Sequence, residues 1–489
     1  MVLSSKHNMG GLHWALLGVL ALMPWPLASN RVWLTGFWLL VTGLLVLVQL
    51  WSRGMRWSFA PALRVHFLLL GLWTLYLGLQ CLPLRGAFGP FLDSGALSVD
   101  PWSSRAYFVK GFLLLLLHGL MVRSFEGRAQ WQTLTWTWLL TAVAVAVAAV
   151  VLFAGGQDYT LFFVEVPQGT RARGPFVYQN QFAGYMEMML ALGMGWMISQ
   201  LGERHAGVTS LLYKSLQFLG SSKAILRVML VILVIGLIAS RSRMGNSAFF
   251  GCLWVVGGAT LLALRRRDEQ RNRGLTRLIG LFMVSVLVID VVIIGGVVGI
   301  DKVIHRIEAT HLEAQARQQV ATGQAAEPSE ESLEQRVGPG LRGLAALKDT
   351  PWLGLGGGTF HLGYFPYRTA DVQGYYDHAH DDYVEFGVEA GLVGSALLLA
   401  LVGWSQWRGW RLLLGRDTSR FERGMAFASV MGVSELLVHS TVDFNLQNPT
   451  NALLFLWLLA LPHQLQARRA RYRSIGEKET VSQEKLCLN

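Results

Sequence analysis

The stretch QTLTWTWLLTAVAVAVAAVVLF, residues 132–153, decides the fold class of this chain. It contains no Asp, Glu, Lys or Arg, and it is long enough to cross the hydrocarbon core of a bilayer as one α-helix. Similar runs recur along all 489 residues, of which 52% are hydrophobic and only 15% charged. Soluble domains carry about 25% charged residues. The sequence therefore predicts an all-α polytopic membrane protein.

Twelve apolar runs are expected to span the membrane. They cover residues 12–29, 32–51, 64–83, 106–123, 132–153, 181–199, 225–240, 246–264, 277–299, 386–407, 424–440 and 450–466. They divide the chain into helices 1–9 (1–299), a large outer loop (300–385), helices 10–12 (386–466) and a tail (467–489). The loop is too long for a simple turn, and we expect it to be partly helical.

Every second connection between these runs carries Lys and Arg residues, as with Arg265, Arg266 and Arg267 after the eighth run. Cytoplasmic loops carry such an excess. We therefore expect both termini in the cytoplasm and 300–385 on the opposite side. This alternation accounts for the net charge of +11, so no nucleic-acid partner is expected. The three cysteines show no spacing typical of a zinc site or a disulfide framework.

The stretch YYDHAHDDYVEFGVEAGLVG, residues 375–394, gathers titratable groups at the outer mouth of the tenth span. His378 and His380 are candidate general bases, and a neighbouring carboxylate such as Asp381 or Asp382 can stabilise the charged imidazole. The alternative is a solvated loop that caps a helix. A metal site is a third interpretation, because His-x-His-Asp offers ligands.

A helix is expected to begin at this cluster. Asp382 followed by Glu385 resembles a capping box, and Glu385 and Glu389 would share one helix face. Ionisable groups at membrane depth usually face a cavity. We therefore expect these groups to line a site at the outer surface.

Two arginine-bearing segments fall on the outer side, where the charge rule disfavours arginine. RARGPFVYQNQFAGY, 171–185, carries Arg171 and Arg173, with Asn180 at the mouth of the sixth span. SRSRMGNS, 240–247, carries Arg241 and Arg243 in a short turn. Guanidinium groups suit a phosphate or diphosphate through bidentate hydrogen bonds. The alternative is that they only anchor helix ends.

Two further outer segments have more than one interpretation. The glycines of PWLGLGGGTF, 351–360, could form an anion-binding nest or a plain tight turn. In HSTVDFNLQNPTN, 439–451, His439 and Asp443 are spaced i, i+4. They either orient other site groups or cap a helix end.

Taken together, these patterns resemble the bacterial O-antigen ligase and O-antigen polymerase superfamily. RGPFVYQNQFAGY, SRSRMG and PWLGLGGGTF are similar to segments of that family. The most specific resemblance is His380-Asp381, nine residues, then Gly391-x-x-Gly394. The ligases place Asn, Ser or Gln where this chain has Asp381. HSTVDFNLQNP is similar to a closing segment common among members.

The resemblance implies a twelve-helix membrane transferase of the C-type glycosyltransferase kind, in the bacterial inner membrane, with its active site facing the periplasm. It implies transfer of a glycan from undecaprenyl diphosphate to an acceptor sugar hydroxyl. The transfer would be inverting and metal-independent, with no cofactor. His380 would be the base, and the outward arginines would bind the diphosphate.

The acceptor stays open between two classes. It is lipid A-core in a ligase and another lipid-linked glycan in an O-antigen or exopolysaccharide polymerase. The histidine–glycine spacing favours a ligase. A polysaccharide flippase would also suit twelve spans, but transporters place charges near the membrane midplane. Here the charges gather at the outer ends of the helices.

Overall fold

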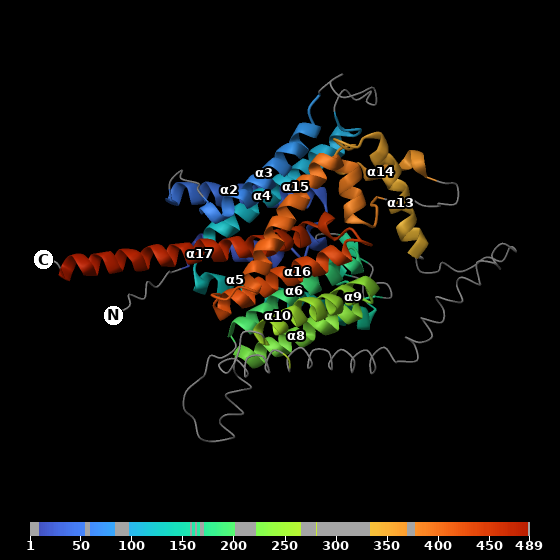
Figure 1. The fold of residues 1–489 in the computed structure, drawn as a ribbon. Helices are drawn as coiled ribbons and strands as arrows, with labels where there is room; N and C mark the ends of the chain where they lie inside the picture. Colours follow the sequence, from blue (N-terminus) through green and yellow to red (C-terminus); the bar gives the residue numbers. More distant parts are fainter. Residues whose placement is uncertain are drawn as a thin grey trace.

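The fold is known from a computed structural model, shown in Figure 1. The structure describes residues 9–53, 59–83, 97–156, 159–161, 164–166, 171–200, 222–265, 280, 333–368 and 377–487.

Helices make up nearly all of the described chain. In the N-terminal half they are α1 (Gly11–Leu22), the 3-10 turn η1 (Leu27–Ser29), α2 (Val32–Arg53), α3 (Pro61–Gln80), α4 (Pro101–Ser124), α5 (Arg128–Gly155), α6 (Gln179–Gln200), α8 (Ser222–Ala239), α9 (Arg243–Cys252), the π-helical turn η2 (Leu253–Gly257) and α10 (Gly258–Arg265). Two short strands, β1 (Tyr159–Leu161) and β2 (Val164–Val166), pair antiparallel between α5 and α6.

The C-terminal half begins with three elements that precede the histidine cluster. They are α13 (Leu333–Asp349), α14 (Phe360–Tyr364) and the 3-10 turn η4 (Phe365–Tyr367). Then follow α15 (Asp382–Leu413), α16 (Arg420–His439), the 3-10 turn η5 (Asn445–Gln447) and α17 (Pro449–Cys487).

Six of the described helical segments are long and apolar enough to cross a membrane. They are Val32–Ser52, Pro61–Gln80, Pro101–Ser124, Arg128–Gly155, Arg243–Leu262 and Asp382–Leu413. Together with the helical architecture, they indicate a polytopic membrane protein. Helices are present at eleven of the twelve predicted runs, and the remaining run, 277–299, lies outside the described residues except for Gly280. A total of twelve spans stays a prediction.

Two of the predicted segments differ in shape from the expectation. The first run, 12–29, is not one helix, because α1 ends at Leu22 and a turn containing Pro24 and Pro26 follows. Proline in a helix interior removes a hydrogen bond and clashes with the preceding turn. At the other end, α17 continues as one helix through Cys487, so no helix end marks the predicted boundary at 466.

The centre of the molecule is the pair α6 and α16, which Figure 1 shows between α8–α10 on one side and α3, α4 and α15 on the other. Every residue of α6 from Asn180 to Ser199 is buried. Gly195 of α6 and Gly424 of α16 face each other so closely that a Cβ on either one would meet the other's carbonyl oxygen. Small residues allow such close helix contact in membranes.

α15 is interrupted at Gly391, which has φ +62° and ψ −168°. The break leaves backbone carbonyls of α15 without helical partners, and the segment after α13 uses them. Leu355 N donates to Val388 O and Gly356 N donates to Glu389 O, both at 2.9 Å. A Cβ at Gly391 would lie 2.5 Å from the backbone of Trp352. Gly391 therefore allows residues 351–356 to cross α15 in direct contact with its backbone. The Gly-x-x-Gly pattern in the sequence did not reveal this role of the glycine.

Candidate functional site

The predicted site groups come from helix ends that meet at one end of the molecule. There α6, α9, α15 and α17 begin and α8 and α16 end. The histidine loop, which we define as residues 377–381, leads directly into α15.

The side chain of His378 is held by the carboxylate of Glu385, which lies in the first turn of α15. Its Nδ1 lies 2.8 Å from Glu385 Oε1, and Ala379 N donates to Glu385 Oε2 at 3.0 Å. Glu385 is 1% exposed. Burial disfavours the imidazolium of His378, but the carboxylates of Glu385 and Glu389 outweigh that effect, so the pKa of His378 lies above its usual value.

His380 has a left-handed backbone, with φ +52°. This region is uncommon for residues other than glycine. Its ring meets the ring of Phe444 edge-on at 5.0 Å, and His378 stacks on the same ring at 4.3 Å. Phe444 also contacts Tyr178, which precedes α6, at 5.1 Å. Both histidines therefore lie on one buried aromatic side chain that links the histidine loop to the arginine-bearing segment 171–178.

The acids next to His380 have roles that differ from the expectation. Asp381, not Asp382, caps α15, because its Oδ1 accepts from Tyr383 N and Val384 N at 2.8 and 3.1 Å. The predicted capping box of Asp382 and Glu385 is wrong. Burial raises the pKa of Asp381, although these backbone amides oppose the shift.

Asp382 lies inside the protein instead and is 2% exposed. Its Oδ2 accepts from Ser440 Oγ at 2.7 Å and from Leu446 N at 3.1 Å, and its own N–H donates to the carbonyls of Ser440 and Asp443. Asp382 thereby ties the start of α15 to the segment between α16 and α17.

Glu389 fixes the glycine-rich segment 351–360 rather than the histidines. It is 2% exposed, and its Oε1 accepts from Phe360 N at 3.1 Å. Gly356 N donates to the carbonyl of Glu389, and Gly357 N donates to Gln80 Oε1. Because these amides serve the protein itself, the geometry favours the tight turn over the anion-binding nest.

The two arginine-bearing segments lie side by side. Ala172 N, between Arg171 and Arg173, donates to the carbonyl of Ala239 at 3.1 Å, directly before the turn that holds Arg241 and Arg243. Arg241 and Arg243 are exposed. The guanidinium of Arg241 lies over the Phe153 ring at 5.6 Å.

The backbone of this region is sterically determined. Arg173 donates to Val177 O at 2.9 Å across a turn in which Gly174 has φ +52°. A Cβ at Gly174 would lie 3.0 Å from the Cβ of Ala149 in α5, so glycine allows the segment to lie against that helix. Arg241 also has a positive φ of +52°. The structure thus brings together the two segments that carry the four predicted arginines.

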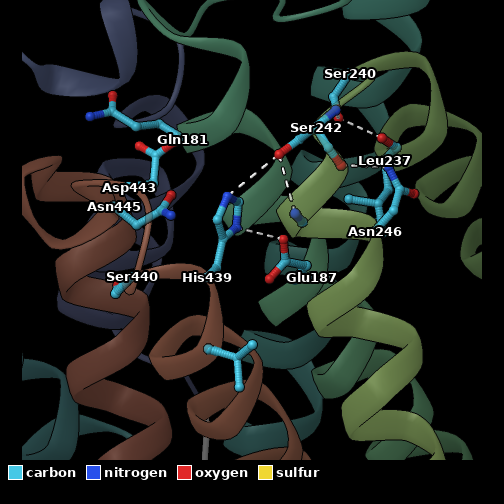
Figure 2. Close-up of polar contacts among 12 residues, drawn as sticks. Gln181, Glu187, Leu237, Ser240, Ser242, Asn246, His439, Ser440, Asp443 and Asn445 are labelled. Carbon is cyan, nitrogen blue, oxygen red and sulfur yellow. Dashed lines mark hydrogen bonds and ion pairs between the residues drawn. The ribbon is translucent and has the colours of Figure 1, made fainter. Parts of the chain in front are cut away.

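His439, the last residue of α16, connects this arginine turn to the protein core (Figure 2). Its Nδ1 lies 2.8 Å from Glu187 Oε1 of α6, and its Nε2 lies 3.5 Å from the Oγ of Ser242. His439 and Glu187 are both fully buried. Ser242, between Arg241 and Arg243, caps α9 by accepting from Gly245 N at 3.2 Å. His439 thus contacts both α6 and the turn that carries the two arginines.

Asp443 and Asn180 are buried beside the same junction. Since α16 ends at His439, Asp443 lies in the following turn and does not share a helix face with it. Its Oδ1 accepts from Phe444 N at 2.8 Å. Asn180 lies in the first turn of α6, but its neighbour Gln181 makes the bridge, donating from Nε2 to Phe444 O at 3.4 Å.

Sequence reasoning did not single out Glu187, Lys110, Gln447 or Phe444 as site groups. A signal existed for Glu187 and Lys110, since each is an ionisable residue inside an apolar run. Phe444 and Gln447 carried no such signal, because their importance comes from contacts between distant helices. Within the described parts of the chain, no three His, Cys, Asp or Glu side chains are arranged to hold a metal ion.

Two comparisons with known proteins bear on this arrangement. Residues 228–415 match the family model described as O-antigen ligase. The matched part contains Arg241, Arg243, the histidine loop and Gly391. A search of curated proteins found no match to this chain. The match over residues 228–415 supports membership of this chain in the O-antigen ligase superfamily.

Proposed function

We propose that this chain is a membrane glycosyltransferase that moves a glycan from undecaprenyl diphosphate to an acceptor sugar hydroxyl at the periplasmic face. The observation that carries the proposal is that the arginine-bearing segments and the histidine loop lie in the same region, since the reaction needs both a cationic group and a base. The hydrogen bond from Ala172 N to Ala239 O joins the segment that carries Arg171 and Arg173 to the residues just before Arg241 and Arg243. The histidine loop reaches the same region through Phe444 and Tyr178.

The arginines supply the charge that the leaving group requires. When the bond between the anomeric carbon and the diphosphate oxygen breaks, its electron pair leaves with the diphosphate. Fixed guanidinium donors stabilise that developing charge, and a planar fork can bind two oxygens at once. Arg173, Arg241 and Arg243 are the proposed donors, with Arg171 beside them. Arg241 and Arg243 are exposed, as a ligand-binding pair must be.

His380 supplies the base. The acceptor hydroxyl oxygen attacks the anomeric carbon, and its proton passes to a ring nitrogen of His380 as the new bond forms. A single displacement of this kind inverts the anomeric centre, and it requires no cofactor. In the sequence, His380 is followed by Asp381, then by nine residues, and then by Gly391. His380 as a whole residue is half-buried.

His378 then has a supporting role. Glu385 accepts from both His378 and the backbone of Ala379, so the pair fixes the loop on which His380 stands. Asp381 and Glu389 fix the start of α15 and the crossing segment in the same way.

Two acceptors suit this chemistry. The histidine–glycine spacing favours lipid A-core, which makes the protein a ligase. One structural observation favours the second candidate, a polymerase with a lipid-linked acceptor. It is an apolar cavity between α3, α4, α15 and α17, with Lys110 among its lining residues.

Reconstitution tests the proposal. Purified full-length protein in proteoliposomes is given an undecaprenyl-diphosphate-linked oligosaccharide, either alone or with lipid A-core, and the products are sized. Glycan on lipid A-core identifies a ligase, and longer lipid-linked glycan identifies a polymerase. No covalent transfer in either arm, with movement of the lipid-linked glycan across the bilayer, would identify a flippase and refute the proposal.

A further inference from the structure

A cavity of about 550 Å³ lies at the end of the molecule opposite the candidate site, and we call it the arginine cavity. Its walls come from the start of α5, the end of α6, the start of α16 and the part of α17 that follows its buried half. α16 connects the two places, because it begins at this cavity and ends at His439. The lining arginines are Arg128, Arg420, Arg468, Arg469 and Arg473.

Glu422 is the one acid that lines the cavity among the described residues, and it is already paired. Its carboxylate accepts from Arg469 Nε at 3.0 Å and from Arg469 Nη2 at 2.9 Å. It also accepts from the backbone N of Ser419 at 2.9 Å. Because one glutamate faces five arginines, the described walls carry an excess of four positive charges.

Two other acids at this end of the molecule do not reduce that excess at the cavity wall. Glu126 pairs with Arg123 at 2.7 Å and with Arg471 at 2.9 Å, and none of these three residues lines the cavity. Asp417 is exposed and lies outside the lining as well. The arginine cavity therefore suits an anion.

Two of the lining arginines are held on one aromatic ring. The guanidinium carbons of Arg128 and Arg468 lie 5.3 and 5.1 Å from the centroid of the Phe421 ring, which also lines the cavity. A guanidinium within about 6 Å of a ring centroid is attracted to that ring. Since Arg128 belongs to α5 and Arg468 to α17, Phe421 gathers like charges from distant parts of the chain. An anion in the cavity would offset their mutual repulsion.

Arg468 also has a donor that an anion could use. Its Nη2 donates to the hydroxyl of Tyr472, another lining residue, at 3.5 Å. Its Nη1 is buried and has no hydrogen-bond acceptor within the described parts of the chain. A buried donor without an acceptor is costly, and more so when it is charged. Phosphate oxygens are good acceptors for guanidinium groups.

The position of the cavity favours a phosphate that belongs to a lipid. Arg128 is the first residue of the apolar segment Arg128–Gly155, so the cavity lies at the end of a helix able to cross a membrane. Basic pockets between membrane helices bind the headgroups of anionic lipids. The charge rule for membrane proteins explains why arginines occur at this end, but it does not explain why three separate helices direct them to one cavity.

We infer that the arginine cavity binds the phosphate-bearing headgroup of an anionic phospholipid. Arg128, Arg468 and Arg473 would contact the phosphate oxygens, whereas Arg469 is held by Glu422. The volume is within the usual range of ligand pockets, about 300–1,000 Å³, so a whole headgroup has room. The inference does not depend on the transfer reaction.

Lipid titration followed by native mass spectrometry tests the inference. The full-length protein in a neutral detergent is mixed with phosphatidylglycerol or with phosphatidylcholine of the same acyl chains, and the Kd of the tightest site is measured. We expect phosphatidylglycerol to bind at least about tenfold more tightly. Arg128→Gln/Arg468→Gln should remove most of that difference. Arg128→Gln/Arg473→Gln should act in the same direction, and it changes only exposed side chains, so it preserves the fold.

Arg411→Gln/Arg416→Gln is the matched control. It removes the same charge from two exposed arginines that do not line the cavity, and it should bind phosphatidylglycerol as the wild type does. Inorganic diphosphate at the same phosphate concentration should not displace the lipid. Size-exclusion elution and unfolding temperature verify that each variant is folded.

Three results would overturn the inference. Equal affinity of the wild type for the two lipids would mean that the cavity does not recognise the headgroup. An equal loss of phosphatidylglycerol binding in the control and in the cavity variants would mean a diffuse effect of charge. Displacement of the lipid by inorganic diphosphate would mean a site for soluble phosphate.

Discussion

At the scale of single residues, the pair of His378 and Glu385 decides how the histidine loop is held. The two side chains are 2.8 Å apart, and Glu385 is almost completely buried. Because the pKa of His378 is raised in the folded protein, the pair contributes stability that is fully present below about 6.5, the usual pKa of histidine. That contribution is lost as the pH rises through the folded-state pKa.

We therefore predict that His378→Asn lowers the unfolding temperature more at pH about 5.5 than at pH about 9. Glu385→Gln should remove the same pH-dependent contribution to the unfolding temperature, because it removes the carboxylate that pairs with His378. Differential scanning fluorimetry in detergent measures both. A difference between wild type and His378→Asn that is constant across this range would show that the ion pair does not form.

The arginine turn is the second feature at this scale. Replacing Arg241 or Arg243 by Ala should lower transfer about 10²–10³-fold, the usual effect of removing one donor to a developing charge. Lys should restore little, because it lacks the planar fork. Arg416→Ala serves as the control, since Arg416 is exposed in the loop between α15 and α16. Transfer assays with a titrated donor would settle the matter, and wild-type turnover in the Arg241→Ala/Arg243→Ala double variant would contradict the assignment.

At the scale of elements, the break in α15 is the feature that places the histidine loop. Gly391→Ala forces a side chain into a backbone conformation that costs roughly 1–3 kcal/mol, and its Cβ would also meet the backbone of Trp352. We expect a clear loss of stability and of transfer together. Gly403→Ala is a matched control in the same helix, because nothing lies within 4 Å of its Cβ position. That substitution should stabilise the helix slightly, by about 0.5–1 kcal/mol.

Thermal unfolding of the two variants side by side provides the measurement. If Gly391→Ala unfolds at the same temperature as Gly403→Ala, the crossing of α15 by residues 351–356 does not hold the fold as described.

The elements were largely predictable and their contacts were not. Long apolar runs identified α2 to α6 and α15 to α17, because hydrophobic length alone favours a helix in a bilayer. The kink at Gly391 could not be predicted, since a Gly-x-x-Gly pattern is also satisfied by close packing of two continuous helices. The capping residue was misplaced by one position, because Asp381 and Asp382 are equally good caps and only tertiary contacts with Ser440 and Leu446 remove Asp382 from that role.

The same holds for the candidate site, whose residues were in part predictable whereas their contacts were not. The arginine-bearing segments stood out in the sequence as departures from the expected charge rule, yet the hydrogen bond between Ala172 and Ala239 that joins the two segments did not. Glu385 and Glu187 are visible in the sequence as ionisable residues in or beside apolar runs, but their pairing with His378 and His439 is recognisable only once the helices are packed.

At the scale of the whole molecule, the account requires that the site end faces the periplasm. Leu362 in α14 is 43% exposed near that end, and Tyr472 in α17 is 61% exposed near the arginine-rich opposite end. In a variant without Cys81, Cys252 and Cys487, we predict that Leu362→Cys reacts with an impermeant thiol reagent added to spheroplasts. Tyr472→Cys should react only after the membrane is opened. The reverse pattern would contradict both the topology and a periplasmic site.

The central claim is that His380 removes the proton from the acceptor hydroxyl, and the most direct measurement is the transfer rate of His380→Ala with a lipid-linked donor. Loss of a general base costs about 10²–10⁴-fold in rate. We predict a loss of that size with normal membrane insertion and an unchanged unfolding temperature. His378→Ala should lose less, and His361→Ala in α14 should lose nothing. A His380→Ala protein that transfers glycan at close to the wild-type rate would contradict the proposed mechanism.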